Sequence, residues 1–318
     1  MKKNIITNAI LIFWFLLSII KANDSRITIN IKTIDQDNMP LGDVLVAVTP
    51  PASANKEKVS ILSKENGEAT VEIEKSLLLI AGASKEGYYQ TRLDIPMSYS
   101  MDKIEGEIKP LLLKLKKITN PIPLYTRNLQ REGAGPLIVP VESQNVGYDL
   151  MVGDWVPPYG KGKVSDLIFF YESNYVSDSE FSRTIKVRFS NKKDGLIPFE
   201  APLHKGSLFV SDYEAPETGY LAEWDQITSR TVENPNQNTR NEHRNFYFRV
   251  RSELDELDEL DELDEQGEII SAHYGKIYGD FMSFIYYFNP TSNDRNVEFD
   301  PKGNLFKNLH WKAKVERP

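Results

Sequence analysis

The sequence predicts an all-β protein with an N-terminal Greek-key, immunoglobulin-like or transthyretin-like β-sandwich and a C-terminal β-sandwich or jelly-roll-like domain. Three observations support this prediction. Aromatic residues make up 11% of the chain, apolar and polar residues alternate with a period of two, and turn signals recur with no helical period between them. A length of 318 residues is enough for two domains, each with its own core.

The segment 26–117 consists of predicted strands separated by turns. Asn66-Gly67 predicts a β-hairpin, because both residues accept a positive φ angle. Leu77–Ala81 is predicted to be a continuous apolar strand. Three further strands are indicated by alternating aliphatic residues, which are Ile27, Ile29 and Ile31; Val44, Val46 and Val48; and Leu111, Leu113 and Leu115.

Three stretches of this segment resemble a known family. They are "DQDNMPLGDVLVAV" at 35–48, "SKENGEATV" at 63–71 and "ASKEGYY" at 83–89. In this order they are similar to the carboxypeptidase regulatory-like (transthyretin-like) domain. The resemblance implies a seven-stranded Greek-key sandwich over 23–117 that serves structure or interaction and carries no catalytic residues. The chain departs from the family pattern between Leu77 and Ala83, and it adds a tail at 97–109.

The remainder of the chain is expected to be a linker at 118–135, held extended by Pro121 and Pro123, and a second β domain at 136–318. Strands are predicted at Leu167–Tyr171, at Ile185, Val187 and Phe189, at Phe246, Phe248 and Val250, and along the aromatic run Phe281–Phe288. This region resembles a group of uncharacterised secreted bacterial proteins through "GDWVPPYGKGK" at 153–163, "HYGKIYGDF" at 273–281 and "NPTSNDRNVEFDPKGNLF" at 289–306. That resemblance implies no known activity.

The first 22 residues are typical of an export signal. Lys2 and Lys3 precede the apolar run Ala9–Ile20, and Ala22 offers a cleavage site. The alternative, an uncleaved membrane anchor, requires about 20 apolar residues, which the run does not supply. The chain has no cysteine, which excludes disulfides, thiolate metal sites and cysteine nucleophiles. We therefore expect a secreted or periplasmic protein with no membrane span after cleavage.

Negative charge is concentrated in one repeat. The formal net charge is −8, and removal of the signal with its three lysines leaves −11, of which ten charges lie in Glu253–Glu268. Leu-Asp-Glu recurs there four times, from Leu254 to Glu265, within an acidic loop at 252–267. Because a period of three gives no apolar stripe on a helix or a strand, we interpret it as a solvated hairpin tip. The alternative is an acidic arm that binds calcium or a partner. The rest of the chain has no basic patch, so we expect no nucleic-acid partner.

Motifs for catalysis, metals and cofactors are missing from the sequence. His204, His243, His273 and His310 are at least thirty positions apart, so no two have metal-ligand spacing. The chain has no Gly-x-Ser-x-Gly elbow, and Gly160-Lys161-Gly162-Lys163 lacks the other residues of a phosphate-binding loop. We therefore assign no catalytic residues, no metal and no cofactor.

Trp155, Tyr159, Tyr213 and Trp224 are the candidate ligand-binding residues, since rings beside Pro157-Pro158 could form a platform for a sugar. The competing interpretation is that the two tryptophans are packing residues, because tryptophan buries a large apolar area. The sequence thus favours an exported, non-catalytic binding or structural module that mediates protein interaction. A carbohydrate-binding module and a hydrolase with an unrecognised site remain alternatives, and the partner is an unidentified protein or glycan.

Overall fold

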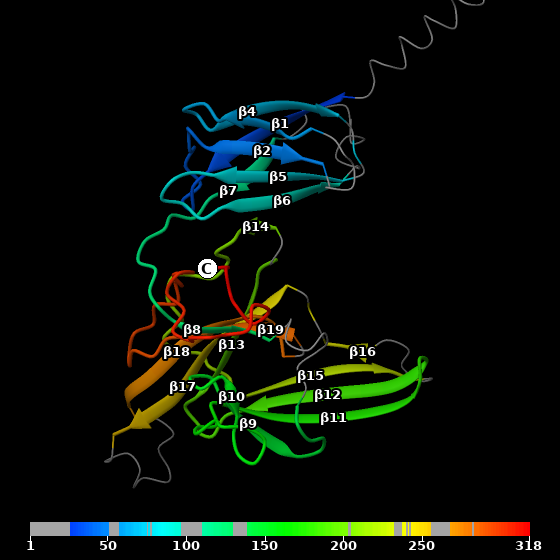
Figure 1. The fold of residues 1–318 in the computed structure, drawn as a ribbon, viewed down its shortest axis with the longest axis vertical. Coiled ribbons are helices and arrows are strands. Elements are labelled where there is room, and N and C mark those ends of the chain that lie inside the picture. The colour runs from blue at the N-terminus through cyan, green and yellow to red at the C-terminus, as the bar shows by residue number, and fades with distance from the viewer. Residues whose placement is uncertain are drawn as a thin grey trace, which may run out of the picture. The chain divides into compact units, whose positions relative to one another are not determined.

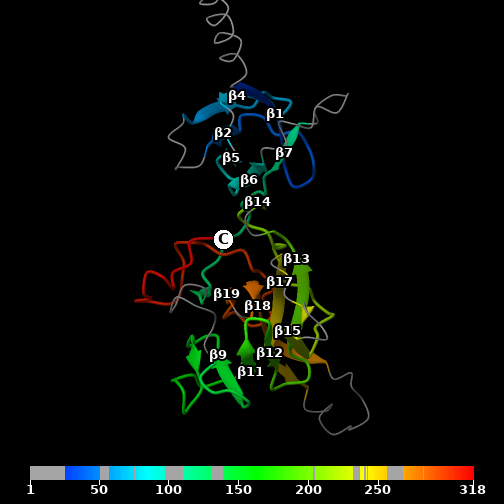
Figure 2. The ribbon, with the colours of Figure 1, turned by 90° about the vertical axis from the view of Figure 1, so that its right-hand side faces the viewer.

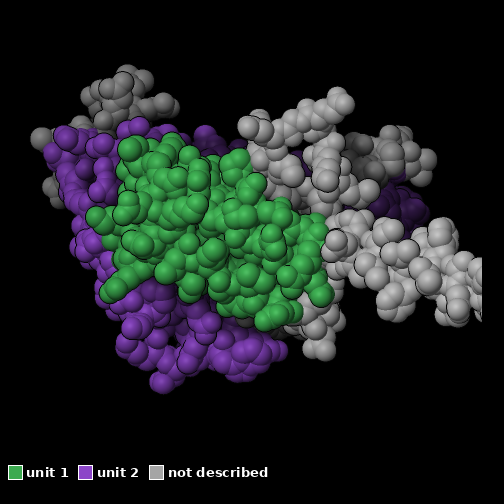
Figure 3. Space-filling view, turned by 90° about the horizontal axis from the view of Figure 1, so that it is seen from above, with its two compact units in different colours: residues 1–118, 204–208 green, residues 119–203, 209–318 purple. Residues whose placement is uncertain are grey.

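The computed structural model describes residues 26–50, 57–74, 76, 78–96, 110–129, 139–202, 205–231, 237–239, 241, 243–255, 268–281 and 283–318. All regular secondary structure in these ranges is β, so the all-β prediction is confirmed. The chain divides into two compact units, coloured separately in Figure 3. The first is Met1–Ile118 with His204–Leu208, and the second is Thr119–Leu203 with Phe209–Pro318. The expected export signal at 1–22 lies outside the described residues.

The first unit contains two sheets, visible as two layers in Figure 1. One has the order β4-β1-β7, and β1 pairs antiparallel with β4 and parallel with β7. The other has the order β14-β6-β5-β2-β3, with antiparallel neighbours throughout. The strands are β1 (Arg26–Ile34), β2 (Leu45–Thr49), β3 (Val59–Leu62), β4 (Glu68–Glu74), β5 (Leu78–Ser84), β6 (Thr91–Pro96), β7 (Leu111–Lys114) and β14 (Gly206–Ser207).

The core of this unit is aliphatic and lies between the two sheets. Alternation along each strand turns one set of side chains inward. The inward set includes Ile29 and Ile31 of β1, Val46 and Val48 of β2, and Leu113 of β7, each at most 1% exposed. The outward residues of the five-stranded sheet remain accessible, and they form the site described below.

Two local predictions for this unit need correction. The turn at Asn66-Gly67 forms, with Gly67 at φ 79°, but it is not a β-hairpin because β3 and β4 belong to different sheets. The turn crosses from one layer to the other, and a Cβ at Gly67 would overlap the carbonyl oxygen of Thr33. The strand predicted at Leu77–Ala81 is β5, shifted to Leu78–Ser84. Its residues alternate between buried and half-buried, so only one of its faces lies in the core.

The second unit is also built on two sheets, seen from a second direction in Figure 2. The six-stranded sheet has the order β10-β9-β11-β12-β15-β16, and the five-stranded sheet has the order β13-β17-β18-β19-β8. The strands are β8 (Tyr125–Asn128), β9 (Asn145–Asp149), β10 (Asp154–Trp155), β11 (Leu167–Ser177), β12 (Glu180–Arg188), β13 (Gly195–Glu200), β15 (Glu223–Arg230), β16 (Gln237–Asn238), β17 (Arg244–Leu254), β18 (Ile269–Asp280) and β19 (Ser283–Phe288).

The five-stranded sheet of this unit is buried on both faces. Phe246, Phe248 and Val250 of β17 enter the aromatic core between the two sheets. Tyr247 and Arg249, on the opposite face of the same strand, are buried as well. Irregular chain covers that second face, through clusters that include Leu124, Phe299, Val315, Ala215 and Val297. This double burial explains why β17 and β18 are apolar along most of their length.

Three stretches of the second unit differ from their sequence-based description. Within the expected linker 118–135, Tyr125–Asn128 form β8 and pair with β19. The aromatic run Phe281–Phe288 is not one strand, because the turn between β18 and β19 follows Asp280. The acidic repeat is flanked by the antiparallel pair β17 and β18, as predicted, but residues 256–267 lie outside the described part of the chain. Residues 130–138 of the linker also lie outside it.

No helix in the described ranges has the length and apolar character needed to cross a bilayer.

Candidate functional site

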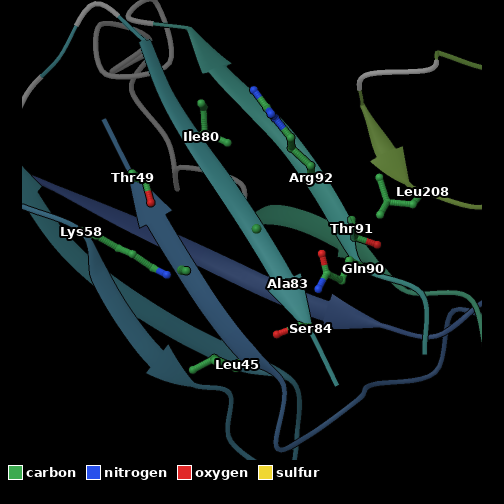
Figure 4. A pocket seen from close by; sticks show the side chains of 12 residues that line it. Leu45, Thr49, Lys58, Ile80, Ala83, Ser84, Gln90, Thr91, Arg92 and Leu208 are labelled. Carbon is green, nitrogen blue, oxygen red and sulfur yellow. The ribbon is translucent and has the colours of Figure 1, made fainter. Parts of the chain in front are cut away.

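A pocket of about 430 Å³ lies on the outer face of the five-stranded sheet in the first unit. We call it the outer-face pocket (Figure 4). Its residues come from β2, β5, β6 and the ends of β3 and β14. The lining is Leu45, Ala47, Thr49, Lys58, Ile80, Gly82, Ala83, Ser84, Gln90, Thr91, Arg92 and Leu208.

Strand alternation and small side chains together produce the pocket. Because Val46 and Val48 point into the core, the residue between them, Ala47, points outward. Its register partner on β5 is Gly82, whose neighbours Ala81 and Ala83 are buried. An alanine opposite a glycine leaves the middle of the sheet's outer face without bulky side chains. Larger outward residues surround this floor, so the surface is hollow there.

Gly82 has no evident role in the fold. Glycine in a strand interior weakens the strand, and it often marks close approach of a ligand or of another backbone. A Cβ placed on Gly82 would lie 3.9 Å from the carbonyl oxygens of Ala47 and Thr91, which is ordinary van der Waals distance. Its φ lies outside the positive range that disfavours other residues. Among the described residues, nothing requires glycine here, and its effect is to keep the floor of the pocket empty.

Two cations flank the floor. Lys58 is exposed just before β3, and Arg92 lies on β6 with 55% of its side chain exposed. Figure 4 shows their side chains on either side of β2 and β5. The Nε of Arg92 is 3.5 Å from Oδ1 of Asp94, which is not one of the lining residues. The lining residues that the structure describes include two cations and no carboxylate, so their net charge is positive.

The described lining residues supply neutral polar groups. Hydroxyl groups are present on Thr49, Ser84 and Thr91, and no histidine or carboxylate occurs among the lining residues that the structure describes. The Thr91 hydroxyl also donates a hydrogen bond to the carbonyl oxygen of Lys114, at 2.6 Å. Aliphatic walls, two cations and several neutral donors and acceptors are the usual components of a recognition surface.

The predicted aromatic residues occupy different surroundings. Trp155 is half-buried, with its ring 5.1 Å from that of Tyr148 and 5.5 Å from that of Phe169. Trp224 is also half-buried, and its edge meets Phe246 at 5.1 Å. Both tryptophans pack against the core of the second unit.

The two tyrosines lie elsewhere. Tyr159 is 41% exposed in the turn after Pro158. Tyr213 is half-buried, and its ring packs 5.2 Å from Phe209. The structure therefore brings Trp155 and Trp224 to one core and places Tyr159 at the surface. Their role in ligand binding stays a prediction.

Sequence reasoning did not select the residues of the outer-face pocket or Trp311. Trp311 is 66% exposed and has the ring of His310 beside it at 5.6 Å. The available signal for the pocket was Gly82 within an apolar strand, since an interior glycine weakens a strand without a local reason. Segments distant in sequence supply the other lining residues, so the sequence alone could not predict the pocket.

A second candidate is a group of buried charges in the second unit. Arg251 donates to both oxygens of Asp166, from Nε at 2.7 Å and from Nη2 at 2.8 Å. Its Nη2 is also 3.1 Å from Oδ1 of Asp149. The side chains of Asp166 and Asp149 are at most 2% exposed. Asp194 accepts hydrogen bonds from the backbone N–H groups of Arg251 and Ser252.

These carboxylates already have their hydrogen-bonding capacity occupied. Asp149 accepts from the backbone N–H groups of Met151, Val152, Lys163 and Val164. A hollow of about 340 Å³ opens beside this group, and Asp166, Asp194 and Arg251 are among its lining residues. Burial raises the pKa of Asp166 and of Asp194 above the ordinary value of an aspartate. The hydrogen bonds of the group tie loops to β17.

Acid should weaken the contribution that Asp149 makes to this charge group. Burial alone would raise the pKa of Asp149, but hydrogen bonds from Lys163, Val152 and Val164 outweigh burial and hold the pKa below 3.8. A lowered carboxyl pKa contributes stability above the unfolded-state value and loses it as the pH falls through the folded-state value. We expect Asp149→Asn to destabilise the protein at about pH 6, with the gap to wild type shrinking below about pH 4. Urea unfolding at both pH values measures this, and a gap that stays constant would contradict the assignment.

Lys276 is a further buried cation, fully enclosed on β18. Its Nζ lies 4.3 Å from the ring centre of Phe209, 4.7 Å from that of Tyr278 and 4.6 Å from that of Tyr287. It also donates to the Ser211 hydroxyl at 3.2 Å. Cation–π contacts of this kind stabilise a desolvated ammonium. Enclosure on all sides keeps Lys276 away from any substrate.

Metal ligands do not converge within the described ranges, where no group of three histidine, aspartate or glutamate side chains could hold an ion. His243 and His310 are exposed. His273 stacks on Phe288 at 5.4 Å and bonds through Nδ1 to the carbonyl oxygen of Asn289. His204 lies outside the described residues.

Comparisons with known proteins assign no family. No protein-family model matches the chain, and no curated protein matches it. One similar solved structure is a DUF3823 family protein from Parabacteroides merdae, with 6% identity, 87% of this chain and 99% of that chain covered, and a TM-score of 0.22. Another, from Bacteroides uniformis, is described as a candidate carbohydrate-binding protein, with 9% identity, 84% and 98% covered, and a TM-score of 0.18. Likeness at this level transfers neither fold nor function.

Proposed function

We propose that the protein is an exported, non-catalytic binding module of the bacterial envelope or exterior that mediates protein interaction through the outer-face pocket. The observation that carries this proposal is Gly82, a strand-interior glycine that no described contact requires and that keeps the pocket floor empty. A glycine that weakens its strand without helping the fold is consistent with close approach of a partner.

The proposed module keeps the sequence-based domain boundaries, except that β8 within the linker pairs with β19 of the second unit and β14 (Gly206–Ser207) pairs with β6 of the first. The signal occupies 1–22, the regulatory-like sandwich 23–117, the linker 118–135 and the second β domain 136–318. The resemblance to the carboxypeptidase regulatory-like family, which implies a seven-stranded sandwich, is supported by the seven strands β1–β7; the two-residue strand β14 adds an eighth to the two sheets. That family serves interaction without catalysis, which agrees with the lack of acid–base groups among the described lining residues of the pocket.

A carbohydrate-binding module is the alternative, favoured by the exposed rings of Tyr159 and Trp311. The described lining residues of the outer-face pocket include no aromatic side chain. The two functions therefore predict different sites, in different units of the chain. This separation makes the alternatives distinguishable with point variants.

The test uses the protein from Asn23 onward as the target of a peptide-binding selection. A phage library of linear twelve-residue peptides is selected on wild type and counter-selected on Gly82→Val, which raises the pocket floor. We expect the enriched peptides to bind wild type, and Gly82→Val to bind them at least about tenfold more weakly, a loss of about 1.4 kcal/mol. Thr28→Val, on an exposed position of β1 in the other sheet, is the matched control and should bind normally.

Two results would reject the proposed function. One is enrichment of no peptide over the counter-selected background. The other is retardation of the protein by a soluble polysaccharide in affinity electrophoresis. To reject the proposal, this retardation must be unchanged in Gly82→Val and lost in Trp311→Ala or Tyr159→Ala. The second result would assign the chain to the carbohydrate-binding alternative.

A further inference from the structure

The charges of the outer-face pocket are unbalanced. Lys58 and Arg92 line it, and none of its described lining residues is acidic. The mature chain carries a net charge of −11, of which ten charges lie in Glu253–Glu268. The described lining residues of the pocket include two cations and no carboxylate, and such a group attracts a negatively charged partner and orients its approach.

The two cations are available to such a partner. The guanidinium of Arg92 forms an ion pair with Asp94 through Nε at 3.5 Å, and this pair leaves Nη1 and Nη2 for a carboxylate. Asp94 thus holds the guanidinium in place beside the floor of the pocket. Lys58 forms no ion pair or side-chain hydrogen bond with the described residues. Figure 4 places the two groups on opposite sides of the floor, so they could hold carboxylates on either side of a ligand.

The remaining walls are aliphatic. Leu45 and Ile80 lie at opposite ends of the outer row, because Leu45 pairs with Ser84 and Ile80 with Thr49. Leu208 adds a third apolar side chain. Leu45 is 45% exposed, so a partner that covers it removes apolar surface from water. Aliphatic side chains of a polypeptide match these walls, whereas a sugar ring would find no aromatic face among the lining residues.

We infer that the outer-face pocket binds an extended polypeptide segment of a partner protein that combines acidic and aliphatic side chains. Carboxylates of the segment pair with Lys58 and Arg92, and its aliphatic side chains cover Leu45, Ile80 and Leu208 above the floor at Gly82. This inference rests on the proposed function and adds the chemistry of the partner to it.

The experiment measures fluorescence anisotropy with three fluorescein-labelled probes. They are the most strongly enriched peptide from the library selection, the same peptide with every Asp and Glu changed to Asn and Gln, and oligogalacturonate. The proteins are wild type, Lys58→Gln, Arg92→Gln and the double variant. Arg26→Gln/Lys64→Gln is the matched control, since it removes two exposed cations of the same unit that do not line this pocket.

We expect the enriched peptide to be acidic and the amide peptide to bind much more weakly. Each single neutralisation should weaken binding of the acidic peptide about fivefold, which corresponds to about 1 kcal/mol for an exposed pair. The double variant should lose on the order of 25-fold if the two effects add. Binding should also weaken between about 0.05 and 0.5 M salt, because salt screens exposed charges. The control should retain wild-type affinity.

The failures of the two proposals differ. A peptide that binds wild type and not Gly82→Val, but tolerates Lys58→Gln/Arg92→Gln and the amide substitution, overturns this inference and leaves the proposed function intact. Oligogalacturonate bound as tightly as the acidic peptide, with the same dependence on both cations, overturns the polypeptide assignment in favour of an acidic glycan. Enrichment of no peptide at all rejects both.

Discussion

Replacement of Arg251 by alanine is expected to destabilise the protein by about 3–5 kcal/mol, the range typical of breaking a buried ion pair. The substitution would leave Asp166 and Asp149, at most 2% exposed, without the cation that neutralises them. Alanine carries a Cβ as arginine does, so the positive φ of 56° at this position costs both residues alike. The loss can therefore be attributed to the charges. Urea unfolding followed by tryptophan fluorescence measures it.

Two comparison variants make this prediction specific. Arg188→Ala breaks a pair with Glu223 at 3.1 Å in which the side chains are 37% and 66% exposed, so it should cost less than about 1 kcal/mol. The double variant Arg251→Ala/Asp166→Asn should recover part of the loss, because it removes one of the stranded charges. Equal costs for Arg251→Ala and Arg188→Ala would contradict a buried network.

Gly275→Ala is expected to cost about 3 kcal/mol or more, the upper range for overpacking a core. Gly275 lies in β18, where a Cβ would overlap the carbonyl oxygen of Tyr287 and the ring of Phe248. Neither group can yield easily, because Tyr287 belongs to the paired strand β19 and Phe248 is fully buried. Thermal and urea unfolding of the variant measure the cost.

Gly82→Ala is the matched control for Gly275→Ala. Both glycines lie inside strands, and only Gly275 is surrounded by atoms that a Cβ would overlap. We expect Gly82→Ala to be neutral or stabilising, since glycine loses more conformational freedom on folding than alanine does. If both substitutions cost the same, the packing described around the two positions is wrong.

Alternation and turn chemistry predicted the all-β class and many of the strands. Ile185 with Val187, and Phe246 with Phe248, lie in the core as their period of two indicated. The pattern could not show which strands share a sheet. Asn66-Gly67 looked like a hairpin turn, yet its flanking strands lie in different layers, because a local turn does not determine long-range pairing. β8 was not predicted either, because it lies in a proline-rich stretch that was expected to be a linker.

The candidate site was less predictable than the fold. Trp155 and Trp224 attracted attention as aromatic residues, and both rings pack against the core. The outer-face pocket depends on the register between Ala47 and Gly82 and on Leu208, more than a hundred residues further along the chain. Sequence periodicity assigns residues to faces, but it does not reveal where small residues from neighbouring strands coincide.

Gly82 keeps space for a partner and is not needed by the fold. The most direct measurement is the free energy of unfolding of Gly82→Val compared with wild type. We expect an increase of about 0.5–1 kcal/mol, because valine favours strands and glycine weakens them, together with loss of peptide binding. A decrease of similar size would show that the fold requires glycine at this position, and it would contradict the claim.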